Sequence, residues 1–132
     1  MRKMSTLLLA LLLLFSARSA FAQSAQTVAA AKKEGGKVNL YTSMETFTAD
    51  ALKKAFEAKT GLQMEYWRGG STEILDRVLS EHRVGKPQFD VVATTGDHMR
   101  LMAKGGAFGK YQSPSFKGFA KDATYPKLGA RY

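Results

Sequence analysis

Glycine, hydroxyl and charged residues stand together at positions 68–72, which read Arg-Gly-Gly-Ser-Thr and separate a strand-like run from a helix-like one. Glycines let backbone amides approach a ligand, and the N–H groups of a first helical turn favour a negative group. Ser71 or Thr72 could cap the helix, and the planar guanidinium of Arg68 suits a carboxylate, carbonate or phosphate. The stretch therefore indicates an anion site, although a capped helix beside an exposed arginine would give the same pattern.

Two further stretches have a similar composition. Residues 42–46 read Thr-Ser-Met-Glu-Thr and residues 94–97 read Thr-Thr-Gly-Asp, and each follows a strand-like run. If the three stretches meet, hydroxyls, backbone amides, one arginine and two carboxylates surround a space suited to a small oxygen-rich ligand. The residues expected to bind that ligand are Thr42, Ser43, Glu45, Arg68, Gly70, Ser71, Thr72, Thr94, Thr95 and Asp97.

The spacing of apolar residues predicts how these stretches are positioned. Strand-like and helix-like patterns alternate as a βαβαβα series, which is typical of an α/β fold with a parallel sheet and right-handed crossovers. In a parallel sheet every loop that leaves a strand emerges at the same edge, so the three polar stretches should be neighbours. The expected strands are 37–42, 62–67 and 89–93, and the expected helices are 26–34, about 47–59, 72–83 and 98–104.

Two packing expectations follow from the same patterns. The run 89–93 is nearly all apolar, which is typical of a strand buried on both faces. The helix at 72–83 should bury the face that carries Ile74, Leu75, Val78, Leu79 and His82. The inward face of the helix at 47–59 should carry Leu52, Ala55 and Phe56, with Phe47 and Thr48 as further candidates.

The first 22 residues have the features of a cleaved signal peptide. A positive start at Arg2 and Lys3 precedes the apolar run 7–15 and the small-x-small sequence Ala20-Phe21-Ala22. As a helix that run would span about 14 Å, against roughly 30 Å for a bilayer core, so it is too short to remain as an anchor. We expect a soluble protein that is exported to the periplasm and is not embedded in the membrane.

Composition narrows the possible functions. The chain has no cysteine, which excludes disulfides, a thiol nucleophile and a cysteine-based metal site. Beyond the first 22 residues, 17 basic residues outnumber 11 acidic ones, but they are scattered along the sequence. Since a nucleic-acid groove needs clustered basic and aromatic residues, we expect a solvated basic surface and no nucleic-acid partner.

From Ala107 onward the periodicity fades, and the aromatic residues stand among Gly, Lys, Ser and Pro. A tail of this length without regular structure is uncommon in a complete compact domain. We therefore expect residues 23–132 to form an N-terminal α/β lobe that is truncated. The late aromatic residues would pack on the sheet or reach toward a missing part, and they are Phe108, Tyr111, Phe116, Phe119 and Tyr125.

Several ordered motifs give the chain a family resemblance over about residues 37–115. In order and spacing it resembles the bacterial extracellular solute-binding proteins of ABC transporters, and its closest branch looks like the ferric-iron-binding type. The resemblance implies the first lobe of a two-lobe clamshell that holds its ligand between the lobes and delivers it to an ABC permease in the inner membrane. The motifs are Leu40-Tyr41-Thr42-Ser43, Ala55-Phe56-Glu57-Ala58-Lys59-Thr60-Gly61, Tyr66-Trp67-Arg68-Gly69-Gly70-Ser71 and Pro87-Gln88-Phe89-Asp90-Val91-Val92.

The same resemblance implies a ligand but leaves it open. Ferric binders of this kind often have a His after the first strand and some have a Glu after the third, where this chain has Glu45 and Thr95. Their adjacent tyrosine ligands lie in the second lobe, beyond Tyr132. Glu45 could replace the His as an oxygen ligand for ferric iron, with Arg68 and Ser71 holding a carbonate or phosphate beside it. Other relatives carry organophosphates, sugar phosphates or polyamines.

Two other classes of function remain as alternatives. An exported α/β hydrolytic enzyme is disfavoured because the sequence has no Gly-x-Ser-x-Gly, His-Glu-x-x-His, Walker or Gly-x-Gly-x-x-Gly motif. Of its two histidines, His82 extends a helix face and His98 stands near a helix start, at the margin of the expected cleft. A stand-alone interaction domain could use Trp67 and the late aromatic residues, which burial against a second lobe explains equally well.

Overall fold

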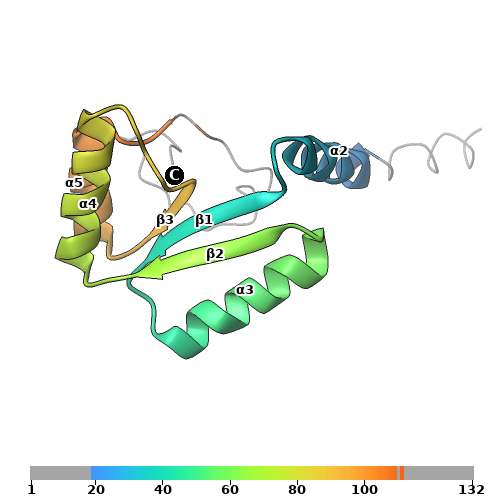
Figure 1. Ribbon diagram of the computed structural model, residues 1–132, viewed down its shortest axis with the longest axis horizontal. Coiled ribbons are helices and arrows are strands. Elements are labelled where there is room, and N and C mark those ends of the chain that lie inside the picture. The colour runs from blue at the N-terminus through green and yellow to red at the C-terminus, as the bar shows by residue number, and fades with distance from the viewer. Residues whose placement is uncertain (1–18, 110, 112–132) are drawn as a thin grey trace, which may run out of the picture.

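The computed structural model describes residues 19–109 and 111, and the side chains from residue 25 onward. Three strands alternate with helices in the order expected from the sequence (Figure 1). The elements are α2 (Ser19–Lys33), β1 (Lys37–Thr42), α3 (Thr46–Thr60), β2 (Gln63–Arg68), α4 (Ser71–Arg83), β3 (Val91–Ala93) and α5 (Gly96–Lys104).

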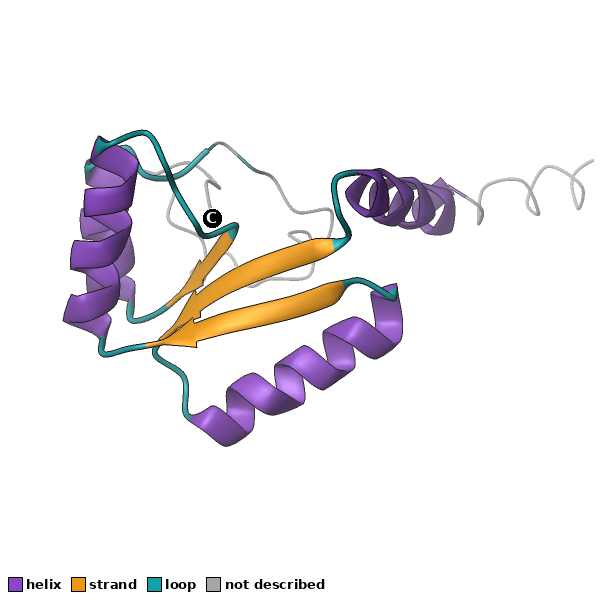
Figure 2. Cartoon of the chain, viewed as in Figure 1, coloured by secondary structure: helices purple, strands orange, loops and turns teal. Residues whose placement is uncertain are grey.

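The strands form one parallel sheet in the order β2-β1-β3, as Figure 2 shows. Thr42 at the end of β1 pairs with Arg68 at the end of β2 and with Ala93 at the end of β3. All three strands therefore end on the same rung of the sheet. The architecture is the predicted α/β fold, a parallel sheet with helices.

The core lies between the sheet and the pair α4 and α5. Tyr41 of β1 packs there with Ile74 and Val78 of α4 and Met102 of α5, and all four are buried. The predicted face of α4 is thus confirmed for its apolar residues, while His82 is exposed. The Tyr41 ring also meets the ring of Trp67 edge-on at a centroid distance of 5.2 Å and that of Phe89 at 5.5 Å.

A polar network centred on Glu81 joins α4 to this core. Its carboxylate accepts hydrogen bonds from the Tyr41 hydroxyl at 2.8 Å, from Nε of Arg77 at 2.9 Å and from the backbone N–H of Gln88 at 2.8 Å. The Arg77 guanidinium lies 4.4 Å from the centre of the Trp67 ring and 4.7 Å from that of Tyr41. Burial alone would raise the pKa of Glu81, but the three donors outweigh it and the pKa is lowered.

Side chains of α3 protect the outer edge of β2. Glu57 accepts a hydrogen bond from the Met64 backbone N–H at 2.9 Å, and Lys53 donates one to the Met64 carbonyl. The Asp50 carboxylate accepts a hydrogen bond from the Tyr66 hydroxyl at 2.6 Å. An edge strand exposes unpaired backbone groups that invite pairing with another chain, and these contacts satisfy them at Met64.

Because α3 covers the edge of β2, the expected inward face of this helix was wrong. Ala49 is fully buried, whereas Phe47 and Leu52 are 77% and 40% exposed. Ala55 and Thr48 are also exposed, and Phe56 alone of the expected residues is partly buried. The helix turns its polar residues Lys53 and Glu57 toward β2, so its apolar pattern did not indicate its packing.

Other expectations need smaller corrections. The third strand is limited to Val91–Ala93, and Val91 is 49% exposed, so among the described residues this strand is not covered on both faces. The helix expected at 26–34 corresponds to α2, which begins at Ser19, ahead of the predicted cleavage site. Phe108 packs on the core and Tyr111 is exposed, while Phe116, Phe119, Tyr125 and residues 1–18 lie outside the described residues.

The Glu81 network makes a prediction about stability. Glu81→Gln should lower the free energy of unfolding by about 1 to 3 kcal/mol at neutral pH, because one partly buried carboxylate satisfies three donors. The folded pKa is below that of an unfolded glutamate, about 4.3, so this stabilisation is complete above that pH and is lost as the pH falls below it. Urea unfolding of both proteins at pH 7 and pH 3.5 measures the difference.

The control is Glu65→Gln, which removes the same charge from an exposed ion pair with Lys37. It should change stability by no more than about 0.5 kcal/mol. An equally small effect at Glu81, or one that does not shrink at low pH, would contradict the role given to the network.

Candidate functional site

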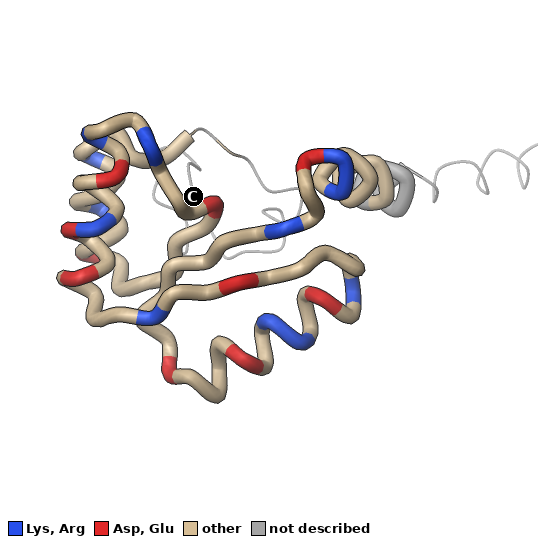
Figure 3. Tube along the Cα trace, in the orientation of Figure 1, with Lys and Arg blue, Asp and Glu red and all other residues tan. Residues whose placement is uncertain are grey.

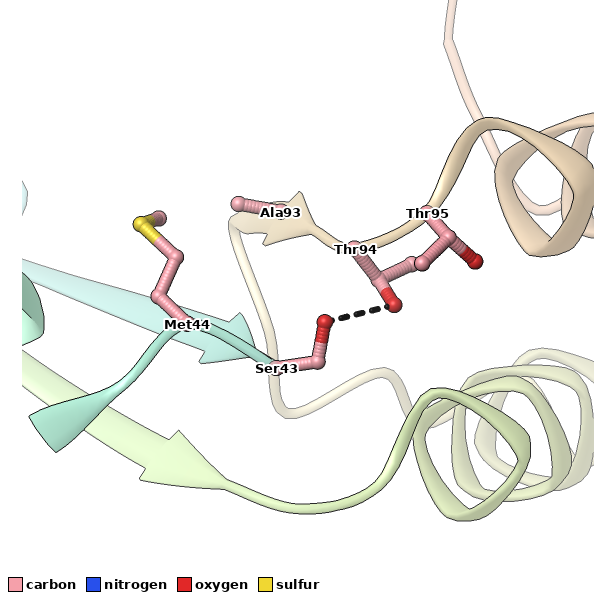
Figure 4. Close-up of a pocket in the computed structure, with 5 residues that line it drawn as sticks. All are labelled: Ser43, Met44, Ala93, Thr94 and Thr95. Atoms are coloured by element: carbon pink, nitrogen blue, oxygen red, sulfur yellow. Dashed lines mark hydrogen bonds between the residues drawn. The ribbon is translucent and has the colours of Figure 1, made fainter.

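The loops that follow β1 and β3 meet at the carboxyl edge of the sheet. The Ser43 backbone N–H bonds the Ala93 carbonyl at 3.1 Å, and the hydroxyls of Ser43 and Thr94 lie 3.0 Å apart. These loops line a pocket of about 370 Å³, shown in Figure 4. Its lining residues are Ser43, Met44, Ala93, Thr94 and Thr95. The pocket thus contains three of the predicted site residues, and all three offer hydroxyl groups.

Arg68, at the end of β2, is held by the loop after β1. Its Nε donates to the Met44 carbonyl at 2.7 Å, and its terminal nitrogen lies 3.2 Å from Oε2 of Glu45. Met44 joins the two parts of the site, because its side chain lines the pocket while its carbonyl holds the arginine. The structure therefore brings together the one arginine and one of the carboxylates that the sequence singled out.

Thr42 and Asp97 make other contacts. Thr42 is fully buried, and its hydroxyl oxygen accepts a hydrogen bond from the Met44 backbone N–H at 3.1 Å. This side chain therefore stabilises the loop after β1. Asp97 forms an ion pair with Arg100 of its own helix. Direct contact of these two side chains with a ligand stays a prediction.

The start of α4 differs from the expected capped helix. Gly70 is the N-cap residue, and its N–H donates to Oε2 of Glu73 at 3.1 Å. Neither Ser71 nor Thr72 caps the helix, because Ser71 is already its first residue. The Gly70 amide, which the sequence suggested for a ligand, is bonded to the protein's own carboxylate.

A histidine that sequence reasoning left at the margin joins two of the loops. Nδ1 of His98 lies 2.7 Å from the Thr95 hydroxyl, and Nε2 lies 3.4 Å from that of Thr72. His98 therefore connects the first turns of α4 and α5. The Thr-Thr-Gly-Asp-His order was visible in the sequence, but nothing in it indicated that Thr72 would lie on the other side of the ring.

Of the two neighbouring glycines, Gly69 and Gly70, only Gly69 is closely packed against other side chains. A Cβ at Gly69 would lie 2.7 Å from the far edge of the Trp67 ring and 2.9 Å from Oε2 of Glu73, whereas Gly70 has open space around it. The ring of Trp67 cannot easily retreat because Tyr41 and Arg77 pack on it. Gly69 is thus needed for the close approach of the Trp67 ring and the Glu73 carboxylate, whereas a side chain at Gly70 would meet no such neighbour.

Charges elsewhere are interspersed. Lys and Arg alternate with Asp and Glu along α3 and α4 (Figure 3), as expected for a solvated surface. Among residues 19–109 and 111, no cluster of three or more His, Asp or Glu side chains could hold a metal ion. Within the same residues, no helix is long and apolar enough to cross a membrane. A metal held at Glu45 would therefore need ligands from outside this part of the chain.

Comparison with known proteins gives one informative result. No protein-family model and no curated protein matches the chain. Among solved structures, the chain is similar to the Trichodesmium protein IdiA (FutA) in complex with iron and citrate ligands, with 25% sequence identity and a TM-score of 0.55. The match covers 62% of this chain and 26% of that one, so the chain spans about a quarter of the length of the structure it matches. The similarity supports the solute-binding-protein fold, and the similar structure is one that holds small ligands.

The close contacts at Gly69 make a second prediction. Gly69→Ala should lower the free energy of unfolding by about 1 to 3 kcal/mol, because the added methyl group displaces the Trp67 ring or the Glu73 carboxylate. Trp67 is the only tryptophan of the chain, so a change in its fluorescence emission would report the displacement directly.

Gly109→Ala is the matched control, since a Cβ there meets nothing within 4 Å. It should leave both the stability and the emission nearly unchanged. Normal stability and emission of the Gly69→Ala protein would show that the turn does not need a glycine at this position.

Proposed function

We propose that the chain is the N-terminal lobe of a periplasmic solute-binding protein that captures ferric iron with an oxyanion, or a small anionic solute, for import by an ABC transporter. The observation that carries the proposal is that two pairs of polar side chains lie at one edge of a parallel sheet. Ser43 contacts Thr94, and Arg68 contacts Glu45. Ligands of open α/β sheets bind at this edge, outside the carboxyl ends of the strands.

The residues suit a ferric complex in complementary ways. The Glu45 side chain is 70% exposed and offers a hard oxygen, which ferric iron prefers. Arg68 offers a planar fork for a carboxylate or phosphate. The similarity to a protein solved with iron and citrate supports this ligand class. Since no cluster of three metal-ligating side chains occurs in the part of the chain that the structure describes, the remaining ligands would come from a second lobe, as the family resemblance implies.

An anionic solute without metal is the second candidate. It is favoured by the three hydroxyl side chains that line the pocket and by Arg68, which bonds to the carbonyl of the pocket residue Met44. Two or three charge-assisted hydrogen bonds, each worth roughly 1.5 to 3 kcal/mol, would offset the desolvation of such an anion. The two candidates differ in whether binding requires the metal.

The exported location and the permease partner belong to the same proposal. The signal sequence predicted at residues 1–22 supports periplasmic localisation, and a binding protein of this kind acts by presenting its ligand to a membrane permease. A hydrolytic enzyme is less well supported, because the similar structure holds iron and citrate and the sequence lacks the hydrolase motifs.

The test is a titration of the full-length protein with ferric citrate, citrate alone and a set of sugar phosphates and organophosphates. We expect at least one to bind with a dissociation constant of about 1 μM or lower, measured by calorimetry. Arg68→Ala should weaken that binding about thirtyfold, which corresponds to roughly 2 kcal/mol, without unfolding the protein.

Arg83→Ala, which removes an exposed arginine at the far end of α4, is the control and should leave the affinity unchanged. Failure to bind any of these compounds would contradict the proposed function. Equal affinities of the Arg68→Ala and wild-type proteins would remove Arg68 from the site.

A further inference from the structure

We propose that Met44 is an oxidation site. A peroxide that enters the pocket at the carboxyl edge of the sheet converts the Met44 thioether to the sulfoxide, and the modified side chain weakens the binding of an anionic ligand. The effect on affinity rests on the proposed function, whereas the choice of Met44 among the methionines rests on the geometry alone.

The methionines of the described part of the chain differ in their access to solvent. Met64 and Met102 are 6% and 0% exposed, and Met99 packs against the core cluster. Met44 is partly buried and lines the pocket, and Figure 4 shows its sulfur near the end of a side chain that extends from the loop after β1. Because the oxidation of methionine follows its exposure, a dissolved oxidant reaches Met44 before the other three.

The pocket has room for such an oxidant. Its volume of about 370 Å³ far exceeds the roughly 15 Å³ that suffices to hold one water molecule. Hydrogen peroxide is only slightly larger than water, so it can enter the pocket beside Met44 while the surrounding side chains keep their positions.

The chemical step needs no reagent besides the peroxide. A lone pair of the sulfur attacks one peroxide oxygen, so that an S–O bond forms as the O–O bond breaks. The departing hydroxide takes the proton from the transferred oxygen and leaves as water. The sulfur is oxidised by two electrons, the peroxide is reduced by two, and the product is methionine sulfoxide.

The backbone of Met44 is held independently of its sulfur. Its N–H donates to the hydroxyl of the buried Thr42 at 3.1 Å, and its carbonyl accepts a hydrogen bond from Nε of Arg68 at 2.7 Å. Neither bond involves the side chain, so both persist after oxidation. The change in polarity is therefore confined to the pocket.

A sulfoxide changes which groups the pocket can offer to a ligand. A thioether is a weak hydrogen-bond acceptor, whereas the sulfoxide is polar and accepts strongly without donating. The hydroxyls of Ser43, Thr94 and Thr95 line the same pocket, and those of Ser43 and Thr94 already share one hydrogen bond at 3.0 Å. Each hydroxyl has a single proton to donate, so one that turns to the sulfoxide is lost to an anionic ligand.

The charge distribution acts in the same direction. The sulfoxide oxygen carries a partial negative charge, which repels an anion in the pocket. Loss of one hydrogen bond corresponds to a decrease in affinity of about twofold to tenfold. The decrease is reversible, because methionine sulfoxide can be reduced enzymatically to methionine.

The first part of the experiment needs no ligand. The full-length protein is treated with hydrogen peroxide, and mass spectrometry of its peptides follows the sulfoxide at each methionine over time. The sulfoxide of Met44 should form about tenfold faster, or more, than those of Met64, Met99 and Met102. An unchanged circular dichroism melting curve confirms that the oxidised protein remains folded.

The second part measures affinity after catalase has removed the peroxide. Ferric citrate, citrate alone and the phosphorylated compounds of the earlier titration are tested with treated and untreated protein. Those that bind the untreated protein should bind the treated protein about twofold to tenfold more weakly. Met44→Leu replaces the thioether by a side chain of similar volume, and treatment should not change the affinities of this variant. Met99→Leu is the matched control and should lose affinity on treatment as the wild-type protein does.

The outcomes separate this inference from the proposed function. Oxidation of another methionine as fast as Met44 would overturn the choice of Met44. Unchanged affinity of wild-type protein oxidised at Met44, or an equal loss in treated Met44→Leu, would overturn the effect on binding. If the untreated protein binds none of the compounds, the proposed function and the effect on affinity are both wrong, and the order of oxidation still tests the choice of Met44.

Discussion

The parallel pairing of β1 with both of its neighbours is the constraint on which the rest of the molecule depends. Thr42 pairs with Arg68 on one side and Ala93 on the other, so three strands stop together. A slip of one residue would reverse the faces of a strand and remove Tyr41 or Trp67 from the core. The register that buries these aromatic rings is therefore the one that brings the three loops to a single edge.

Stability and ligand chemistry occupy different parts of this edge. On the α4 side, Tyr41, Trp67, Arg77 and Glu81 fix the sheet against the helices through ring contacts and a satisfied carboxylate. The residues proposed to bind the ligand are exposed or line an open pocket, and their partners can be exchanged at small cost. A packed frame with exposed polar groups at its edge is compatible with the proposed role of binding and releasing a ligand.

The sequence predicted the architecture well because periodicity and loop composition report directly on strands, helices and their order. It could not predict contacts set by the direction of single side chains. Arg68 reaches Glu45 through the turn of one loop, and His98 meets Thr72 across a separation of 26 residues. The prediction of the buried face of α3 was wrong because this helix covers the edge of β2. There Lys53 and Glu57 form hydrogen bonds with backbone groups, which apolar residues could not do.

The ligand site proposed for this protein lies at the carboxyl edge of the sheet, at Glu45 and Arg68. The most direct test is a crystal structure of the full-length protein grown with ferric citrate, with anomalous diffraction collected at the iron absorption edge. If the proposed function is right, an iron peak should lie within bonding distance of the Glu45 carboxylate, and a citrate oxygen should accept a hydrogen bond from Arg68. An iron peak remote from this edge, with the Glu45–Arg68 ion pair intact, would contradict it.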